Sequence, residues 1–162
     1  MEDCKRARLI PVVGIRGALE AEQRATSSLL AVLSVVRDLS AELLNPLGAP
    51  KSKKALVETY TEVPFSLDGE SLRPDGLIRV SYGKNCFTTL VEVKTGRNQL
   101  TKEQVKAYLK TARREKFDHV ITISNQIAAG GAHPVRGLGV NQNSRVKVTH
   151  WSWMRILATA LR

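Results

Sequence analysis

The sequence predicts an α/β domain built on a single mixed β-sheet with helices on both faces. Three observations support this prediction. Residues 17–44 have the periodicity of a long amphipathic helix, three strand-like runs follow it, and a second helix at 102–115 precedes a short apolar run at 120–123. A buried strand that follows a crossover helix pairs parallel to an earlier strand, so the sheet should contain both parallel and antiparallel pairs.

The first helix is predicted from the apolar residues that gather on one face when successive residues are placed at about 100° steps. These residues are Leu19, Leu29, Leu30, Leu33, Val36 and Leu44. The stretch 45–48 contains a proline and a glycine, and it should end the helix.

The three strands are predicted at 56–65, 76–82 and 87–94. In the first, alternate residues have strand-forming side chains that should line one face, namely Val57, Thr59, Thr61 and Val63. Asp68 and Gly69 indicate a turn between the first and second strands. Residues 83–85 should join the second and third strands as a hairpin.

The second helix has a predicted buried stripe that consists of Val105, Tyr108, Leu109 and Ala112. After the strand at 120–123, residues 125–143 are rich in Gly, Asn and Gln and should form a long loop. A last strand at 146–149 and a helix from Trp151 onward complete the pattern. We interpret residues 1–162 as one domain, which is either a complete small protein or the first domain of a longer chain.

The composition is that of a globular protein, with 43% hydrophobic and 25% charged residues. The longest apolar stretch, 29–33, is too short to span a bilayer, and the first residues lack the apolar core of a signal peptide. We therefore expect a cytoplasmic protein. Cys4 and Cys86 have no metal-ligand spacing and should be free thiols, and the three histidines show no zinc-site spacing.

The chain has a formal net charge of +10. Lysines and arginines that replace counterions on phosphates gain free energy from counterion release, so this charge favours a polyanionic partner such as nucleic acid. Lys53 and Lys54, in a basic loop before the first strand, are candidates for contacts to the DNA backbone. A solvated loop is the alternative interpretation of these lysines.

Asp75, Glu92 and Lys94 interrupt otherwise apolar strands. Because side chains alternate along a strand, Glu92 and Lys94 share one face. An even-length hairpin loop centred between Gly83 and Lys84 places Asp75 opposite Glu92, whereas an odd-length loop shifts the register by one residue. Both registers remain open from the sequence. The structural alternative is a surface ion pair of Glu92 with Lys94 or Arg97, together with a turn formed by Pro74 and Asp75.

Two carboxylates and an ammonium group at the edge of an apolar sheet suit a divalent cation. Carboxylate oxygens are the ligands that Mg²⁺ prefers, and two carboxylates this close would otherwise force one of them to take up a proton. The cation would polarise a phosphate and lower the pKa of a bound water, and the lysine would orient that water or stabilise the developing charge.

Pro74 and Asp75, followed across a hairpin by Glu92, Val93 and Lys94, resemble the signature of the PD-(D/E)XK, or restriction-endonuclease-like, nuclease superfamily. The predicted element order, α-β-β-β-α-β, is similar to the core of that family. The resemblance implies that Asp75 and Glu92 hold Mg²⁺, or Mn²⁺ as a substitute. It also implies that the backbone carbonyl of Val93 contributes to the metal site and that Lys94 assists the attacking water.

Glu22 lies at the centre of the apolar face of the first helix, whereas Glu20 projects to the opposite side. A carboxylate on a core-facing stripe needs a partner. Members of the superfamily often place an acid on this helix to complete the metal site, and the resemblance, which covers most of residues 17–124, assigns that place to Glu22. The alternative is that Glu22 reaches solvent from a frayed helix start.

Gln104 and Tyr108 lie one turn apart on the second helix and are similar to the Gln-x-x-x-Tyr motif of RecB-like members of the superfamily, which implies contact with the substrate. Two structural alternatives remain open. Gln104 could bond back to the backbone of Thr101 as part of a capping box, and Tyr108 could simply belong to the core.

These observations predict a Mg²⁺-dependent nuclease that hydrolyses phosphodiester bonds of nucleic acid, with DNA favoured over RNA. Two alternatives stay open. One is a catalytically inactive nucleic-acid-binding domain of the same fold. The other is a protein-interaction module that docks onto a helicase, an ATPase or another part of a larger DNA-processing assembly.

Overall fold

The computed structural model describes residues 5–7, 18–127 and 132–162, so Cys4 and Gly17 lie outside the described residues. The helices are α1 (Ala18–Val35), α2 (Arg37–Leu44), the 3-10 turn η1 (Asn45–Leu47), α3 (Lys102–Arg114) and α4 (Trp153–Ala160). The strands are β1 (Lys5–Arg6), β2 (Leu56–Thr61), β3 (Phe65–Leu67), β4 (Glu70–Leu72), β5 (Gly76–Tyr82), β6 (Asn85–Val93), β7 (His119–Ser124) and β8 (Lys147–Ser152). In this part of the chain, no helix is long and apolar enough to cross a membrane.

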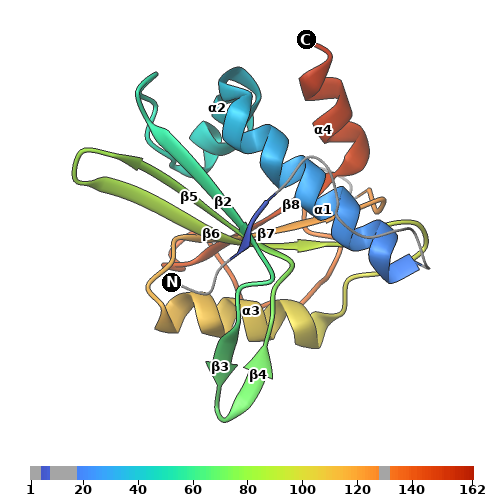
Figure 1. The fold of residues 1–162 in the computed structure, drawn as a ribbon. Helices are drawn as coiled ribbons and strands as arrows, with labels where there is room; N and C mark the ends of the chain where they lie inside the picture. The colour runs from blue at the N-terminus through green and yellow to red at the C-terminus, as the bar shows by residue number, and fades with distance from the viewer. Residues whose placement is uncertain (1–4, 8–17, 128–131) are drawn as a thin grey trace.

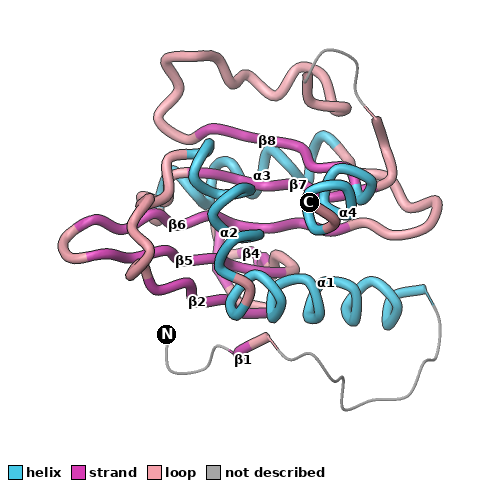
Figure 2. Tube along the Cα trace, turned by 90° about the horizontal axis from the view of Figure 1, so that it is seen from above, coloured by secondary structure: helices cyan, strands magenta, loops and turns pink. Residues whose placement is uncertain are grey.

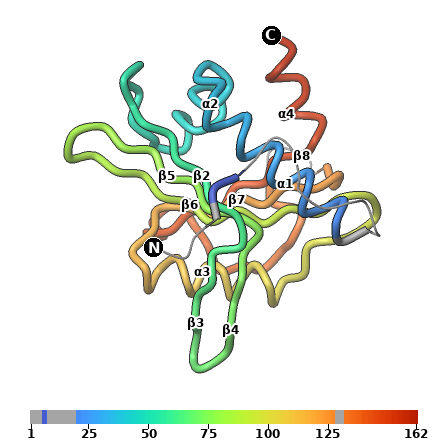
Figure 3. The backbone as a smooth tube through the Cα atoms, in the orientation of Figure 1, coloured from blue at the N-terminus to red at the C-terminus, as the bar shows by residue number. Residues whose placement is uncertain are grey.

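A six-stranded sheet forms the centre of the molecule, with the strand order β1-β2-β5-β6-β7-β8 (Figure 2). Strands β1, β2, β5 and β6 pair antiparallel, while β6, β7 and β8 pair parallel. The prediction of a mixed sheet in the order α-β-β-β-α-β is therefore confirmed, with β3 and β4 added as a separate hairpin. That hairpin extends from the sheet past α3 (Figure 3).

Helices α1, α2 and α4 cover one face of the sheet, and α3 covers the other (Figure 1). The alternation of side chains along β5 explains the two cores. Ile78 and Val80 are buried in the cluster under α1 and α2, whereas Leu77 is buried in the cluster under α3. In β6, Val91 and Val93 belong to the first cluster, so Glu92 points to the α3 face.

The predicted helix at 17–44 is in fact two helices, because the chain leaves the helical conformation at Val36 (φ −93°, ψ 92°). Val36 is 44% exposed, so the prediction that it lies on the buried face was wrong. A β-branched side chain loses χ1 freedom in a helix, and Val36 follows another valine. The break redirects the chain, so that α2 buries Leu39, Leu43 and Leu44 instead.

The predicted strand at 56–65 ends early, at Thr61. Glu62 has a positive φ of 53°, which turns the chain out of the sheet and toward the β3–β4 hairpin. Because of this turn, Val63 packs in the cluster under α3, whereas Val57 packs against the other cluster. The prediction that they line one face was therefore wrong. The predicted turn at Asp68 and Gly69 is confirmed.

The last helix begins at Trp153 and not at Trp151, as predicted. Trp151 belongs to β8 and is fully buried. The side chain of Ser152 caps α4 by accepting a hydrogen bond from the backbone N–H of Arg155 at 3.1 Å. β8 therefore extends to Ser152, and α4 begins at the next residue.

Candidate functional site

The β5–β6 hairpin has the even-length register. Gly76 pairs with Val91 and Tyr82 pairs with Asn85, so Gly83 and Lys84 form a two-residue turn. One step beyond Gly76, this register brings Asp75 opposite Glu92 at the end of the hairpin.

Asp75 lies just before β5, where Asp75 Oδ2 accepts a hydrogen bond from the backbone N–H of Val93 at 2.7 Å. Burial, together with the negative charge of nearby Glu92, raises the pKa of Asp75 to about 7. The next residue is Gly76 for a steric reason, because a Cβ there would lie 2.5 Å from Leu30 Cδ1. The missing side chain lets α1 pack closely against β5 beside the site.

Glu92 is the most deeply buried acid of this group, with 1% exposure. Its Oε1 accepts a hydrogen bond from Gln104 Nε2 at 2.6 Å and lies 2.7 Å from Lys94 Nζ. Its Oε2 is buried and has no hydrogen-bond partner among the described residues. A buried charged oxygen without a partner is costly, so the site as it stands is electrostatically incomplete.

Lys94 follows the last residue of β6 and contacts acids from both faces of the sheet. Its Nζ also lies 3.0 Å from Oε1 of buried Glu22, while Glu22 Oε2 accepts hydrogen bonds from Thr95 N at 3.2 Å and Asn98 Nδ2 at 3.3 Å. Burial disfavours the charged form of Lys94, but its hydrogen bonds to Glu92 and Glu22 and the charges of Glu92 and Asp75 raise its pKa above the usual value. Lys94 is therefore held as an ammonium ion.

Glu22 thus points inward to this group and not to solvent. Glu20 is partly buried rather than fully exposed. Within residues 5–7, 18–127 and 132–162, no three acids, histidines or cysteines lie close enough to hold a metal ion as they stand. Glu22 and Glu92 both contact Lys94 instead.

Helix α3 brings Gln104 and Tyr108 to the same group. The backbone N–H of Gln104 donates to Thr101 Oγ1 at 3.3 Å, but the Gln104 side chain turns to Glu92 and also donates to Tyr108 Oη at 3.3 Å. The side-chain half of the capping box is therefore not formed. Burial, followed by the charge of Glu92, raises the pKa of buried Tyr108 and keeps it a neutral phenol.

Lys53 and Lys54 are exposed in the loop before β2 and lie away from the carboxylates. Because Leu56 pairs with Ser81, this loop is near the far end of β5. Six residues of strand separate Ser81 from Asp75, or about 20 Å. These lysines and the carboxylates cannot contact the same phosphate.

Two further contacts to the site were not predicted from the sequence. Asn98 holds Glu22, as described above, and Trp153 Nε1 donates a hydrogen bond to the backbone carbonyl of Lys94 at 3.0 Å. Trp153 is 59 residues away from Lys94 in the chain. No local periodicity indicates a contact of this range.

A separate chain of hydrogen bonds lies beside Glu92 on the α3 face of the sheet. Thr122 pairs with Glu92 in the parallel register, and its Oγ1 lies 2.8 Å from His133 Nε2 and 3.0 Å from His150 Nδ1. Burial lowers the pKa of both histidines, followed for His133 by the charge of His150, and this favours neutral rings. His133 belongs to no sequence motif that indicates a role.

The direction of this chain follows from the outer partners of the two rings. Val135 N donates to His133 Nδ1 at 3.0 Å, and the carbonyl oxygen of Val135 lies farther from Nδ1, at 3.3 Å. The shorter contact favours the tautomer with the proton on Nε2, which donates to Thr122. His150 Nε2 lies 2.9 Å from the carbonyl oxygen of Gln126, so Nε2 carries the proton and Nδ1 accepts from Thr122. The chain therefore runs in one direction, from His133 through Thr122 and His150 to Gln126.

No family model matches the sequence, and no curated protein matches it. Among solved structures, the chain is similar to one described as "MspJI Restriction Endonuclease in Complex with 27-mer Oligonucleotide", with 15% sequence identity and a TM-score of 0.34. The similarity covers 94% of this chain and 35% of that chain, so this chain spans about a third of its length. A TM-score this low carries no argument about function.

Proposed function

We propose that this chain is a metal-dependent nuclease, which hydrolyses phosphodiester bonds of nucleic acid, above all DNA, with a metal-activated water. The observation that carries the proposal is the buried Oε2 of Glu92, which has no partner among the described residues. It lies beside Asp75, whose pKa is raised to about 7 by burial and by Glu92. A divalent cation between these two acids would remove both electrostatic costs.

The residues present fit Mg²⁺, with Mn²⁺ as a substitute. Asp75, Glu92 and the backbone carbonyl of Val93 would hold it, and Glu22 would join them directly or through a water. When bound, the cation would polarise the phosphate and lower the pKa of a water molecule. The donors are carboxylate and carbonyl oxygens, which suit these hard cations better than they suit zinc.

The protein's own groups would prepare the site for this reaction. Lys94 stays charged, so it can orient the attacking water or stabilise the negative charge that develops on the phosphate. Glu22 fixes the position of the ammonium group. Gln104 occupies Oε1 of Glu92, leaves Oε2 for the cation and would face the substrate. Tyr108 belongs to the core under α3, and its hydroxyl would help to position Gln104.

The net charge of +10 supports a nucleic acid as the substrate. Lys53 and Lys54 would then contact phosphates remote from the scissile bond, because they lie about 20 Å along the strand from Asp75.

The test is cleavage of plasmid, linear duplex and single strands in the presence of Mg²⁺, Mn²⁺ or a chelator. We expect cleavage with the metals, none with the chelator, and a loss of orders of magnitude in Asp75→Asn and Glu92→Gln. Glu103→Gln is the matched control, since Glu103 is an exposed acid on α3. Cleavage that persists in Glu92→Gln would overturn the proposal. Binding without cleavage in the wild type would favour the inactive nucleic-acid-binding alternative.

A further inference from the structure

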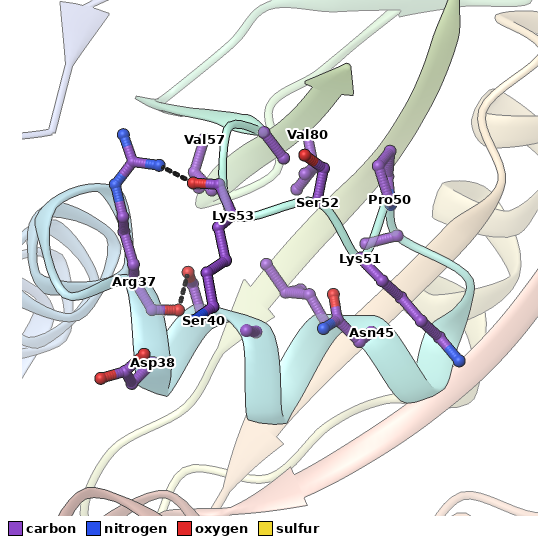
Figure 4. A pocket seen from close by; sticks show the side chains of 14 residues that line it. Arg37, Asp38, Ser40, Asn45, Pro50, Lys51, Ser52, Lys53, Val57 and Val80 are labelled. Atoms are coloured by element: carbon purple, nitrogen blue, oxygen red, sulfur yellow. Dashed lines mark hydrogen bonds between the residues drawn. The ribbon is translucent and has the colours of Figure 1, made fainter.

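A cavity of about 340 Å³ lies at the opposite end of the sheet from the carboxylates. Its walls are α2, the segment from Ala49 to Ala55, and the first part of β2 (Figure 4). Val80 of β5 also lines it. This volume falls within the range of small-molecule sites, which is about 300–1,000 Å³.

The cavity combines an apolar lining with a cationic rim. Its apolar wall includes Leu44, Ala49, Ala55, Val57 and Val80. Its charged residues are Arg37, Lys51, Lys53 and Asp38, which are three cations and one anion. Such a lining suits a ligand with a flat apolar part and a negatively charged group.

A polar side chain that could form hydrogen bonds with the flat part of the ligand lies between two of the cations. In Figure 4, the Lys51 and Lys53 side chains extend from the loop toward α2, and Asn45 lies between them in this view. The side-chain amide of Asn45 offers both donors and an acceptor, which match the polar edge of a nucleobase.

The loop that carries the lysines is held in place before any ligand binds. Arg37 Nη1 donates a hydrogen bond to the backbone carbonyl of Lys53. The side chain of Ser52 accepts from Lys54 N at 3.1 Å, and its carbonyl accepts from Ala55 N at 2.9 Å. A preformed wall reduces the entropy that binding would cost.

We propose that this cavity binds a nucleoside phosphate, either as a free nucleotide or as an unpaired nucleotide of a strand. The base would contact the apolar wall and Asn45, and the phosphate would face Lys51 and Lys53. The cavity is distinct from the site formed by Asp75 and Glu92. Val80 lies about 17 Å along β5 from Asp75, and its side chain points to the other face of the sheet. The inference therefore does not depend on the proposed nuclease activity.

Calorimetric titration of the Asp75→Asn protein with deoxynucleoside monophosphates tests this inference, because that variant should leave oligonucleotides intact. Inorganic phosphate is titrated in parallel. Two changes address the cavity: Lys53→Glu reverses a charge on its rim, and Ala55→Leu fills it. Lys106→Glu makes the same charge change on exposed α3 and serves as the control. Circular dichroism reports whether each variant is folded.

We expect the nucleotides to bind, and both cavity changes to weaken binding at least about tenfold, while the Lys106 change has little effect. An oligonucleotide with an unpaired end that displaces the bound nucleotide identifies the strand as the source, and failure to displace it identifies the free nucleotide. Absence of nucleotide binding would overturn the inference. So would inorganic phosphate binding as tightly as the nucleotide, or equal losses in the control.

Discussion

Removal of the Lys94 ammonium group tests whether its positive charge stabilises the buried carboxylates of Glu22 and Glu92. In Lys94→Ala, buried Glu22 and Glu92 both lose the cation that lies 3.0 and 2.7 Å from them. Leaving a buried charge without its partner typically costs about 3–5 kcal/mol. We expect this loss in the free energy of unfolding at pH 7 in chelator, measured by urea denaturation.

Mg²⁺ should restore part of that stability if the acids bind it, because a ligand of the folded state stabilises it by mass action. At a concentration about 100 times the Kd, the gain is about 2.7 kcal/mol. The gain should be larger in Lys94→Ala than in the wild type, since the competing ammonium is gone. Turnover should nevertheless fall by orders of magnitude, because the water or the phosphate loses its fixed positive charge.

Lys110→Ala is the matched control. Lys110 pairs with Asp68 on the surface, where the two side chains are 60% and 69% exposed, so its loss should cost little stability. A Lys94→Ala protein that loses no more stability than this control would refute the buried ion-pair network. Equal stabilisation of Lys94→Ala and the wild type by Mg²⁺ would refute the metal assignment to these acids.

Three other predictions address the site, the core and the charge. Gln104→Ala removes the 2.6 Å hydrogen bond to Glu92 and should lower kcat about tenfold or more, which steady-state cleavage rates would detect. Burial of His119, followed by the charge of Lys147, lowers its pKa from 6.5 to about 4, so between these values the unfolded chain binds more protons than the folded one. The contribution of His119 to stability should therefore fall as the pH drops from 6.5 toward 4, by about 2 kcal/mol at pH 5. Asp75, whose pKa is raised, contributes with the opposite sign in this window, so the difference between the urea-denaturation profiles of the wild type and His119→Gln isolates the His119 component. Nucleic-acid affinity should fall with salt on a log–log slope of about −0.9 per duplex phosphate neutralised, and a flat salt profile would contradict an electrostatic interface.

Much of the site follows from local periodicity. The two-residue period of β5 and β6 predicts that Glu92 and Asp75 meet once the turn length is known, and the structure has the even-length turn. The helical period predicts that Glu22 faces inward, as it does. These relationships depend on neighbouring residues in the chain, so a pattern in the sequence can carry them.

The features that the sequence did not predict depend on single dihedral angles or distant contacts. The break at Val36 and the positive φ of Glu62 each change the direction of the chain at one residue, without disturbing the hydrophobic pattern around it. The contact between Trp153 and Lys94 joins residues that are close only after the sheet has formed. Secondary-structure periodicity contains no information about such pairs.

The one-way chain of hydrogen bonds from His133 to Gln126 has a consequence for the number of protons it can hold. The Thr122 hydroxyl has a single hydrogen, which it gives to His150 Nδ1 while it accepts one from His133. If a third imidazole proton were placed on His150 Nδ1, both histidines would donate hydrogen bonds to Thr122 Oγ1. The hydrogen of the Thr122 hydroxyl would then have no acceptor in this chain of hydrogen bonds. Reversal of the chain would move a proton to His133 Nδ1, which would lose the 3.0 Å hydrogen bond from the N–H of Val135 and could donate only to the carbonyl oxygen of Val135 at 3.3 Å. The hydrogen bonds beside Glu92 therefore favour one arrangement of protons, with two neutral rings.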